Sequence, residues 1–210
     1  TTTMRGGAGN DTLSVTFWNN ASTFNGGAGI DTMTGGNAGD SYLFNLGEGK
    51  DTITDDDWYR DAAAFETDRV VFGTGIRPQD LVVKRVGNAL VMDHINGTDG
   101  LSISNWFSSS NFYIERFEFA DSTVWDLNTL RAREIAYVGT AGADVVTGWD
   151  GNDRIDGGAG NDTLYTGAGT NVLLGGLGDD RLEVSGAGVH TLDGGDGNDS
   201  LVGGDGNDGL

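Results

Sequence analysis

The sequence predicts an all-β fold in three parts: coiled arrays of short strands at residues 1–57 and 138–210, and between them, at 58–137, a small antiparallel β-rich domain with a short helix. Two observations predict it. A nine-residue unit, Gly-Gly-any-Gly-any-Asp followed by a short apolar stretch, repeats in both flanks of a chain with 37 glycines and one proline. Between the flanks, glycine becomes rare, and aromatic and β-branched residues take over.

The array at 138–210 contains eight copies of the unit, with one extra residue, Val184, after the fifth. The copies begin at Gly139, Gly148, Gly157, Thr166, Gly175, Ser185, Gly194 and Gly203. Their eighth positions are all aliphatic: Val146, Ile155, Leu164, Leu173, Leu182, Leu192, Leu201 and Leu210. Because an inward-pointing strand residue requires such a fixed apolar period, we expect these side chains to form the core.

The sixth positions of this array predict a metal site. If two units make one turn of the coil, residues eighteen apart stack at the ~4.8 Å spacing of paired strands. One column then reads Asp144, Asp162, Asp180 and Asp199, and the other reads Asp153, Asn171, His190 and Asp208. Carboxylates about 5 Å apart repel by about 3 kcal/mol at an effective dielectric of 20, so a cation between turns is favoured. Oxygen ligands in irregular geometry suit calcium better than magnesium.

The array at 1–57 is shorter and less regular. Its sixth-position aspartates are Asp11, Asp31, Asp40 and Asp51, and Ser22 takes the place of another. We expect Asp11, Asp31 and Asp51 to stack, although they recur every twenty residues. For the run Asp55-Asp56-Asp57, a solvated acidic turn is favoured over a cation site. For His190, a surface turn residue is favoured over a metal ligand.

The segment at 58–137 has strand composition at 69–72, 81–86, 89–95, 101–107, 114–119 and 123–125, and hairpin signals at Gly87-Asn88 and Asn96-Gly97. Asp126 is placed to cap a short helix that carries Leu127, Leu130 and Ile135. A modest core is expected from the large apolar residues Trp58, Phe72, Trp106, Phe117, Phe119 and Trp125. These strands would also cover the end strand of the first array, which otherwise invites edge pairing.

Charge and composition narrow the function. The net charge of -20 argues against nucleic acid or an anionic membrane as partner and favours cations. Cysteine is absent, no apolar run approaches eighteen residues, and the N-terminus lacks the regions of a signal peptide. Both ends read as interrupted repeats, so we expect the chain to be a fragment of a longer protein.

These motifs carry a family resemblance. The arrays resemble the haemolysin-type calcium-binding repeats of RTX proteins. Residues 68–125, with Asp80-Leu81-Val82-Val83, Gly87-Asn88-Ala89-Leu90 and Ser104-Asn105-Trp106-Phe107, resemble the segment that follows the repeats in such toxins. The resemblance implies right-handed parallel β-rolls, an extracellular location, unfolded export by type I secretion machinery, and folding driven by several Ca²⁺ ions.

The resemblance also implies the ligands. Calcium would be held between turns by carboxylates of Asp144, Asp162, Asp180, Asp199, Asp153, Asp208, Asp11, Asp31, Asp40 and Asp51. Backbone carbonyls would come from Gly139, Gly157, Gly158, Gly160, Gly175, Gly176, Gly178, Gly194, Gly195 and Gly197. Asn171, His190 and Ser22 depart from the pattern, which weakens the sites at those positions.

Two further functions compete with a calcium-binding, non-enzymatic module. In an adhesin segment, the middle domain would bind a sugar or protein through Trp58 or Trp106, with the arrays as spacers. An enzyme is disfavoured, because the sequence has two histidines, no cysteine and no convergent acid–base set. His94 lies in an expected strand and is interpreted as a packed or solvated residue, not as a catalytic base.

Overall fold

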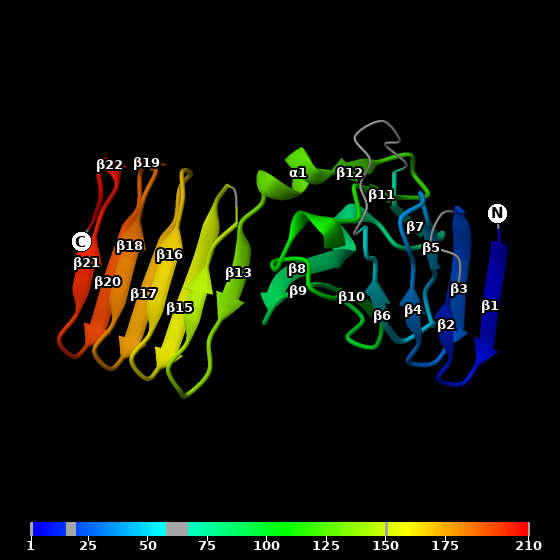
Figure 1. Ribbon diagram of the computed structural model, residues 1–210, viewed down its shortest axis with the longest axis horizontal. Helices are drawn as coiled ribbons and strands as arrows, with labels where there is room; N and C mark the ends of the chain where they lie inside the picture. Colours follow the sequence, from blue (N-terminus) through cyan, green and yellow to red (C-terminus); the bar gives the residue numbers. More distant parts are fainter. Residues whose placement is uncertain (1, 16–19, 58–66, 150, 210) are drawn as a thin grey trace. The chain divides into compact units, whose positions relative to one another are not determined.

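The computed structural model describes residues 2–15, 20–57, 67–149 and 151–209. They form two compact units, one from Thr1–Val83 with Asn88–Leu127 and one from Lys84–Gly87 with Asn128–Leu210. The regular elements described are β-strands, one short α-helix and two 3₁₀ turns (Figure 1), which confirms the all-β prediction. No helix among the described residues has the length and apolar character needed to cross a bilayer.

The first unit is built on two sheets of mostly parallel strands. The first sheet contains β1 (Thr2–Ala8), β3 (Ser22–Ala28), β5 (Ser41–Phe44), β7 (Arg69–Phe72), β11 (Arg116–Glu118) and β12 (Val124–Asp126) in this order. The second contains β2 (Thr12–Ser14), β4 (Thr32–Thr34), β6 (Lys50–Thr54), β10 (Gly100–Ile103) and β9 (Ala89–His94). Only the β11–β12 and β10–β9 pairs among these are antiparallel.

Successive short strands of the first array alternate between the two sheets, so each pairs with the strand one coil turn later. The register joins Met4 to Phe24 and Leu13 to Met33, twenty residues apart in both cases. Every second side chain of β3 faces the interior, as the two-residue period of a strand requires. In this core, Phe24 and Tyr42 stack with their ring centroids 5.0 Å apart.

The middle segment continues these two sheets, which differs from the separate domain expected from residue 58 onward. Strand β7 pairs in parallel with β5, and β10 pairs in parallel with β6. The physical reason is the expected one: the last strands of the array would otherwise expose unpaired backbone groups. Residues 58–137 therefore do not form one compact unit, because the first unit takes them up to Leu127, apart from residues 84–87.

The expected aromatic core of the middle segment is confirmed where the structure describes it. Phe72, Trp106, Phe117, Phe119 and Trp125 are buried, whereas Trp58 lies outside the described residues. The helix α1 (Leu127–Arg131) is shorter than expected. It buries Leu130, and Ile135 instead begins strand β13 (Ile135–Val138).

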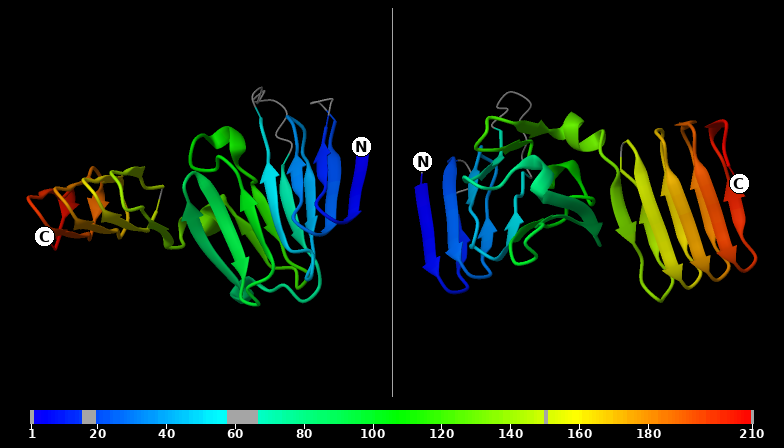
Figure 2. Two further views of the ribbon diagram at one scale, coloured as in Figure 1. Left: turned by 90° about the horizontal axis from the view of Figure 1, so that it is seen from below. Right: turned by 180° about the vertical axis from the view of Figure 1, so that it is seen from behind.

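The second unit is a regular coil of parallel strands. One sheet contains β13, β15 (Asp153–Ala159), β17 (Val172–Leu177) and β20 (Thr191–Asp196), and the facing sheet contains β14 (Val145–Thr147), β16 (Thr163–Thr166), β18 (Arg181–Val184) and β21 (Ser200–Val202). Figure 2 shows β15, β17 and β20 side by side in the yellow-to-red part of the chain. Two further short strands, β19 (Ala187–Gly188) and β22 (Asp205–Gly206), pair in parallel with each other. Residues 84–87 join this unit from the end of β8 (Leu81–Val86), where Lys84 pairs with Ala136.

The predicted apolar column forms the core of this unit. Buried residues with at most 2% of their surface exposed are Val146, Ile155, Leu164, Leu173, Leu182 and Leu192. Leu201 is partly buried against them, and Leu210 lies outside the described residues. The inserted residue Val184 also packs in this core, so the coil accommodates the extra residue without exposing it.

Candidate metal centres

A ladder of hydrogen bonds joins the sixth-position aspartates of the second unit. The backbone N–H of Asp144 donates to Oδ1 of Asp162 at 2.8 Å, and that of Asp162 donates to Oδ1 of Asp180 at 2.7 Å. Asp180 donates in the same way to Oδ1 of Asp199 at 2.9 Å. The structure thus brings the unbroken column together as the eighteen-residue spacing predicts. Each acceptor aspartate therefore uses one carboxylate oxygen to accept the backbone N–H of the aspartate one turn earlier in the chain.

The second oxygen of the two central aspartates of this column accepts no hydrogen bond, whereas Oδ2 of Asp144 accepts from the N–H and the hydroxyl of Thr140. Oδ2 of Asp162 and of Asp180 is buried and has no hydrogen-bond partner. A buried, ionised oxygen without a partner carries a large desolvation cost unless a cation compensates it. The donor set is entirely oxygen, which is the set that calcium takes. These residues therefore fit calcium, because their buried carboxylate oxygens are without hydrogen-bond partners and are available as ligands.

Where a unit begins with glycine, that glycine makes room for the second oxygen of the sixth-position aspartate. A Cβ placed on Gly157 would lie 2.4 Å from Oδ2 of Asp162, and one on Gly175 would lie 2.3 Å from Oδ2 of Asp180. The second position of the unit requires glycine for a different reason, its backbone conformation. Gly176 has a φ of 105°, a region that side chains disfavour, and a Cβ there would lie 2.1 Å from the carbonyl oxygen of Gly158. Glycine at these positions thus lets carbonyls and carboxylates of successive turns approach closely.

The second column of this unit keeps its stacking but not its carboxylates. Asp153 donates its N–H to Oδ1 of Asn171 at 2.9 Å, and His190 donates to Oδ1 of Asp208 at 3.2 Å. The Asn171 amide donates to the carbonyl of Gly167 at 3.0 Å and so supplies a donor inside the turn.

His190 is not the surface residue that the sequence favours. It is 1% exposed, and both ring nitrogens are buried without a hydrogen-bond partner. The backbone of the coil turns the sixth side chain inward whatever the residue type, which is why the prediction was wrong.

The first unit contains an equivalent ladder. Asp11 donates its N–H to Oδ1 of Asp31 at 2.8 Å, and Asp31 donates to Oδ1 of Asp51 at 2.9 Å. Oδ2 of all three is buried and unpartnered. Burial, together with the neighbouring charges of Asp31, Glu48 and Asp99, raises the pKa of Asp51 from 3.8 to about 7, although the hydrogen bond from the backbone of Asp31 acts to lower it. The twenty-residue spacing therefore still stacks its aspartates.

Another column of the first unit extends beyond the repeats. Ser22 donates its N–H to Oδ1 of Asp40 at 2.6 Å, and Asp40 donates to Oδ1 of Asp68 at 2.7 Å. Asp68 donates in turn to Oε2 of Glu115 at 3.0 Å. Sequence reasoning missed Asp68 and Glu115. A signal existed for Asp68, which immediately precedes the apolar strand β7 as a sixth-position aspartate precedes its own strand.

Two of the three aspartates that follow β6 are buried rather than solvated. Asp55 is 0% exposed and Asp57 is 5% exposed, contrary to the turn favoured from the sequence. Burial raises the pKa of Asp55 well above its ordinary value, and that of Asp68 as well, with the charges of nearby carboxylates adding to both. Tyr42, whose hydroxyl donates to Asp55 at 2.8 Å, has a pKa raised by the same burial and by that carboxylate.

Two other predicted roles can be placed. His94 is mostly buried and accepts a hydrogen bond at Nδ1 from the N–H of Asn96 at 3.2 Å, as a packed residue does. Trp106 is 0% exposed, and it packs on Tyr113 and Phe117. Trp106 therefore presents no exposed ring on which a sugar could stack.

Fold and donor pattern together define a parallel β-roll of the metal-binding kind, with carboxylates aligned between its turns. Comparison with family models gives the family. The RTX calcium-binding nonapeptide repeat matches residues 2–14, 137–164, 150–182 and 185–210. The haemolysin-type calcium binding protein related domain matches residues 90–129. A search of curated proteins gives no matching relative.

The chain therefore carries RTX calcium-binding nonapeptide repeats and a haemolysin-type calcium binding related segment, as its motifs suggested, and these matches imply Ca²⁺ as the ligand at the repeat sites. RTX repeat solenoids are a structural calcium-binding family whose members are typically secreted. In the first array the repeat model matches residues 2–14, and in the second array its matches extend over most of residues 137–210.

Proposed function

We propose that this chain is a non-enzymatic module that folds when extracellular calcium binds between the turns of its two coils. The observation that carries the proposal is the row of buried, unpartnered carboxylate oxygens in the stacked turns. Folding brings these charges together and removes them from water, so the folded coil without a cation is penalised at every turn.

The proposed ligands follow the ladders. In the second unit they are Asp144, Asp162, Asp180 and Asp199, with Asp153 and Asp208 as weaker contributors, and carbonyls of the first, second and fourth glycines complete each site. In the first unit they are Asp11, Asp31 and Asp51, together with Asp40 in the neighbouring column. A bound calcium would neutralise the facing carboxylates of two turns and so convert their repulsion into attraction.

The free energy of calcium binding is large enough to decide folding. Extracellular calcium modules have dissociation constants of roughly 10⁻⁴ to 10⁻³ M, so such sites are largely empty in cytosol and occupied outside. At ten times its dissociation constant, a ligand adds about 1.4 kcal/mol per site. Four or five sites then add about 6 to 7 kcal/mol, which is comparable with the stability of a whole domain.

This dependence suits export in an unfolded state. We infer that the chain belongs to a larger secreted protein that leaves the cell through type I secretion machinery and folds only outside. The RTX repeat matches and the net charge of -20, which keeps a calcium-free chain extended, support this inference.

Urea unfolding of matched variants tests the proposal. Wild type in 2 mM calcium should lose several kcal/mol of its free energy of unfolding when calcium is replaced by EGTA. Asp162→Asn should recover less stability from calcium, whereas Asp196→Asn should behave like wild type, because Asp196 is exposed and is not a sixth-position residue. An unfolding midpoint unchanged by EGTA would refute the proposal.

A further inference from the structure

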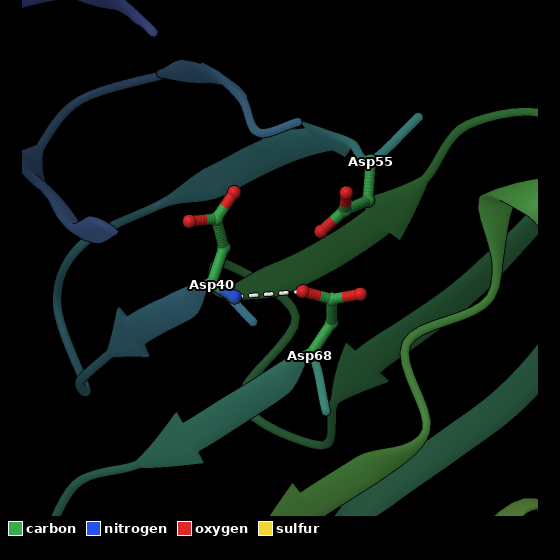
Figure 3. Close-up of side chains that lie close together, drawn as sticks. All are labelled: Asp40, Asp55 and Asp68. Atoms are coloured by element: carbon green, nitrogen blue, oxygen red, sulfur yellow. Dashed lines mark hydrogen bonds between the residues drawn. The ribbon is translucent and has the colours of Figure 1, made fainter. Parts of the chain in front are cut away.

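A second kind of acidic site lies in the first unit, where the array meets the strands that follow it. One carboxylate oxygen of each of Asp40, Asp55 and Asp68 lies within 4.8 Å of the other two (Figure 3). Asp68 belongs to a second such triad with Asp57 and Glu115. The three residues of Figure 3 come from separate segments: Asp40 precedes β5, Asp55 follows β6, and Asp68 precedes β7.

The cluster is fixed in place and enclosed. Asp40, Asp55 and Asp68 are each at most 1% exposed. The N–H of Asp40 holds Oδ1 of Asp68, and the hydroxyl of Tyr42 holds Oδ2 of Asp55. Each of these two carboxylates is therefore oriented by a hydrogen bond to one oxygen, which leaves its other oxygen in a determined position.

Those other oxygens are without partners. Oδ1 of Asp55 and Oδ2 of Asp68 are buried and make no hydrogen bond. Buried polar atoms in folded proteins nearly always have a partner, so two unpaired carboxylate oxygens in one enclosed cluster call for an additional group. Figure 3 shows the carboxylate of Asp55 directed toward Asp40 and Asp68, and one oxygen of the Asp68 carboxylate turned toward the N–H of Asp40.

We propose that this cluster is a divalent cation site, of the class that calcium fills, built mainly from residues outside the nonapeptide pattern. Calcium takes oxygen ligands at about 2.3 to 2.6 Å, so two ligands of one ion lie up to about 5 Å apart. One carboxylate oxygen from each of the three aspartates meets this limit, because these oxygens lie within 4.8 Å of one another. Magnesium, with ligands at about 2.0 to 2.1 Å in strict octahedral geometry, would need a tighter group of oxygens.

An ion at this site would connect different parts of the chain from the ions within the arrays. An ion between repeats joins one repeat to the next, but Asp68 and Glu115 stand directly before β7 and β11, which lie beyond the first array. Glu115 also falls within the residues that match the haemolysin-type related domain. A cation at Asp68 would therefore fasten the strands of that domain to the end of the coil.

Calcium counting by equilibrium dialysis tests this site, with the full chain at saturating calcium. Asp55→Asn and Asp68→Asn keep an oxygen that can accept the existing hydrogen bonds but lose the charge, and each should bind at least one ion fewer than wild type. Asp121→Asn, an exposed change in the same unit, should keep the wild-type count. Far-UV circular dichroism confirms that each variant is folded.

Terbium luminescence gives a second readout that does not depend on removing a ligand. The phenol of Tyr42 is 2.8 Å from a proposed ligand, so Tyr42→Phe should lower tyrosine-sensitised terbium emission while leaving the calcium count unchanged. Unchanged emission together with unchanged counts in Asp55→Asn and Asp68→Asn would overturn this inference. If Asp162→Asn still lost an ion in the same assay, the function proposed above would stand without it.

Discussion

The substitution Gly175→Ala tests whether the first glycine of a unit exists to accommodate the carboxylate. Gly175 has no positive φ, so alanine meets no backbone strain there, only the lack of space. The added methyl would lie 2.3 Å from Oδ2 of Asp180 and 2.4 Å from the carbonyl of Gly194. Overpacking of this kind costs about 1 to 3 kcal/mol. Loss of one calcium site at ten times its dissociation constant adds about 1.4 kcal/mol.

The matched control is Gly167→Ala in the same coil. Gly167 also lacks a positive φ, and a Cβ there would meet nothing within 4 Å. This change should be neutral or stabilising by about 0.4 to 1 kcal/mol, because alanine restricts the unfolded chain. Urea unfolding in 2 mM calcium should therefore separate the two variants by roughly 2 to 5 kcal/mol. Equal stability of the two variants would refute the role given to the first glycine.

Three further predictions concern the core, pH and a lost ligand. Leu164→Ala, at a fully buried core position, should lower the free energy of unfolding in urea by about 2 to 5 kcal/mol. Val145→Ala, at a position that is 78% exposed, should change the free energy of unfolding by less than about 0.5 kcal/mol. Similar losses in the two variants would contradict the core assignment. The pKa of Asp51 is raised from 3.8 to about 7 in the calcium-free fold, so its proton stabilises that fold below pH 4 and the stabilisation is lost as pH rises through 7. In calcium-depleted buffer, the folded fraction measured by circular dichroism should therefore fall from pH 5 to 8. In calcium, where protons compete for the ligands, the free energy of unfolding should rise from pH 5 to 7. A change of the same sign in both buffers would be inconsistent with this. His190→Asp should restore a carboxylate to the interrupted column and add one bound ion in equilibrium dialysis, and an unchanged count would show that the column has lost more than this ligand.

The fixed spacing of the repeats explains how much of the fold was predictable. Identical units must stack in one register, so the positions of Leu164 and Asp162 along the sequence determine their places in the core and in the ladder. The first array shows the same logic, because a twenty-residue spacing from Asp11 to Asp31 still equals one coil turn. The repeat period alone therefore predicts which core residues and which aspartates stack on successive turns.

Where the repeat ends, sequence reasoning fails for a physical reason. Glu115 reaches Asp68 because β11 pairs with β7, a contact 47 residues apart that no local pattern encodes. Burial of Asp55 likewise depends on strands that arrive later in the chain. Single acidic residues carry no periodic signal, so Asp57 and Asp55 read as a solvated turn.

Far-UV circular dichroism during a calcium titration tests the central claim most directly. The claim is that carboxylates stacked on successive turns stay together only when divalent ions lie between them. We expect a largely unfolded spectrum after calcium is removed and a β-sheet spectrum restored cooperatively at millimolar calcium but not by equal magnesium. A full β-sheet spectrum without calcium, unchanged through the titration at neutral pH, would contradict the claim.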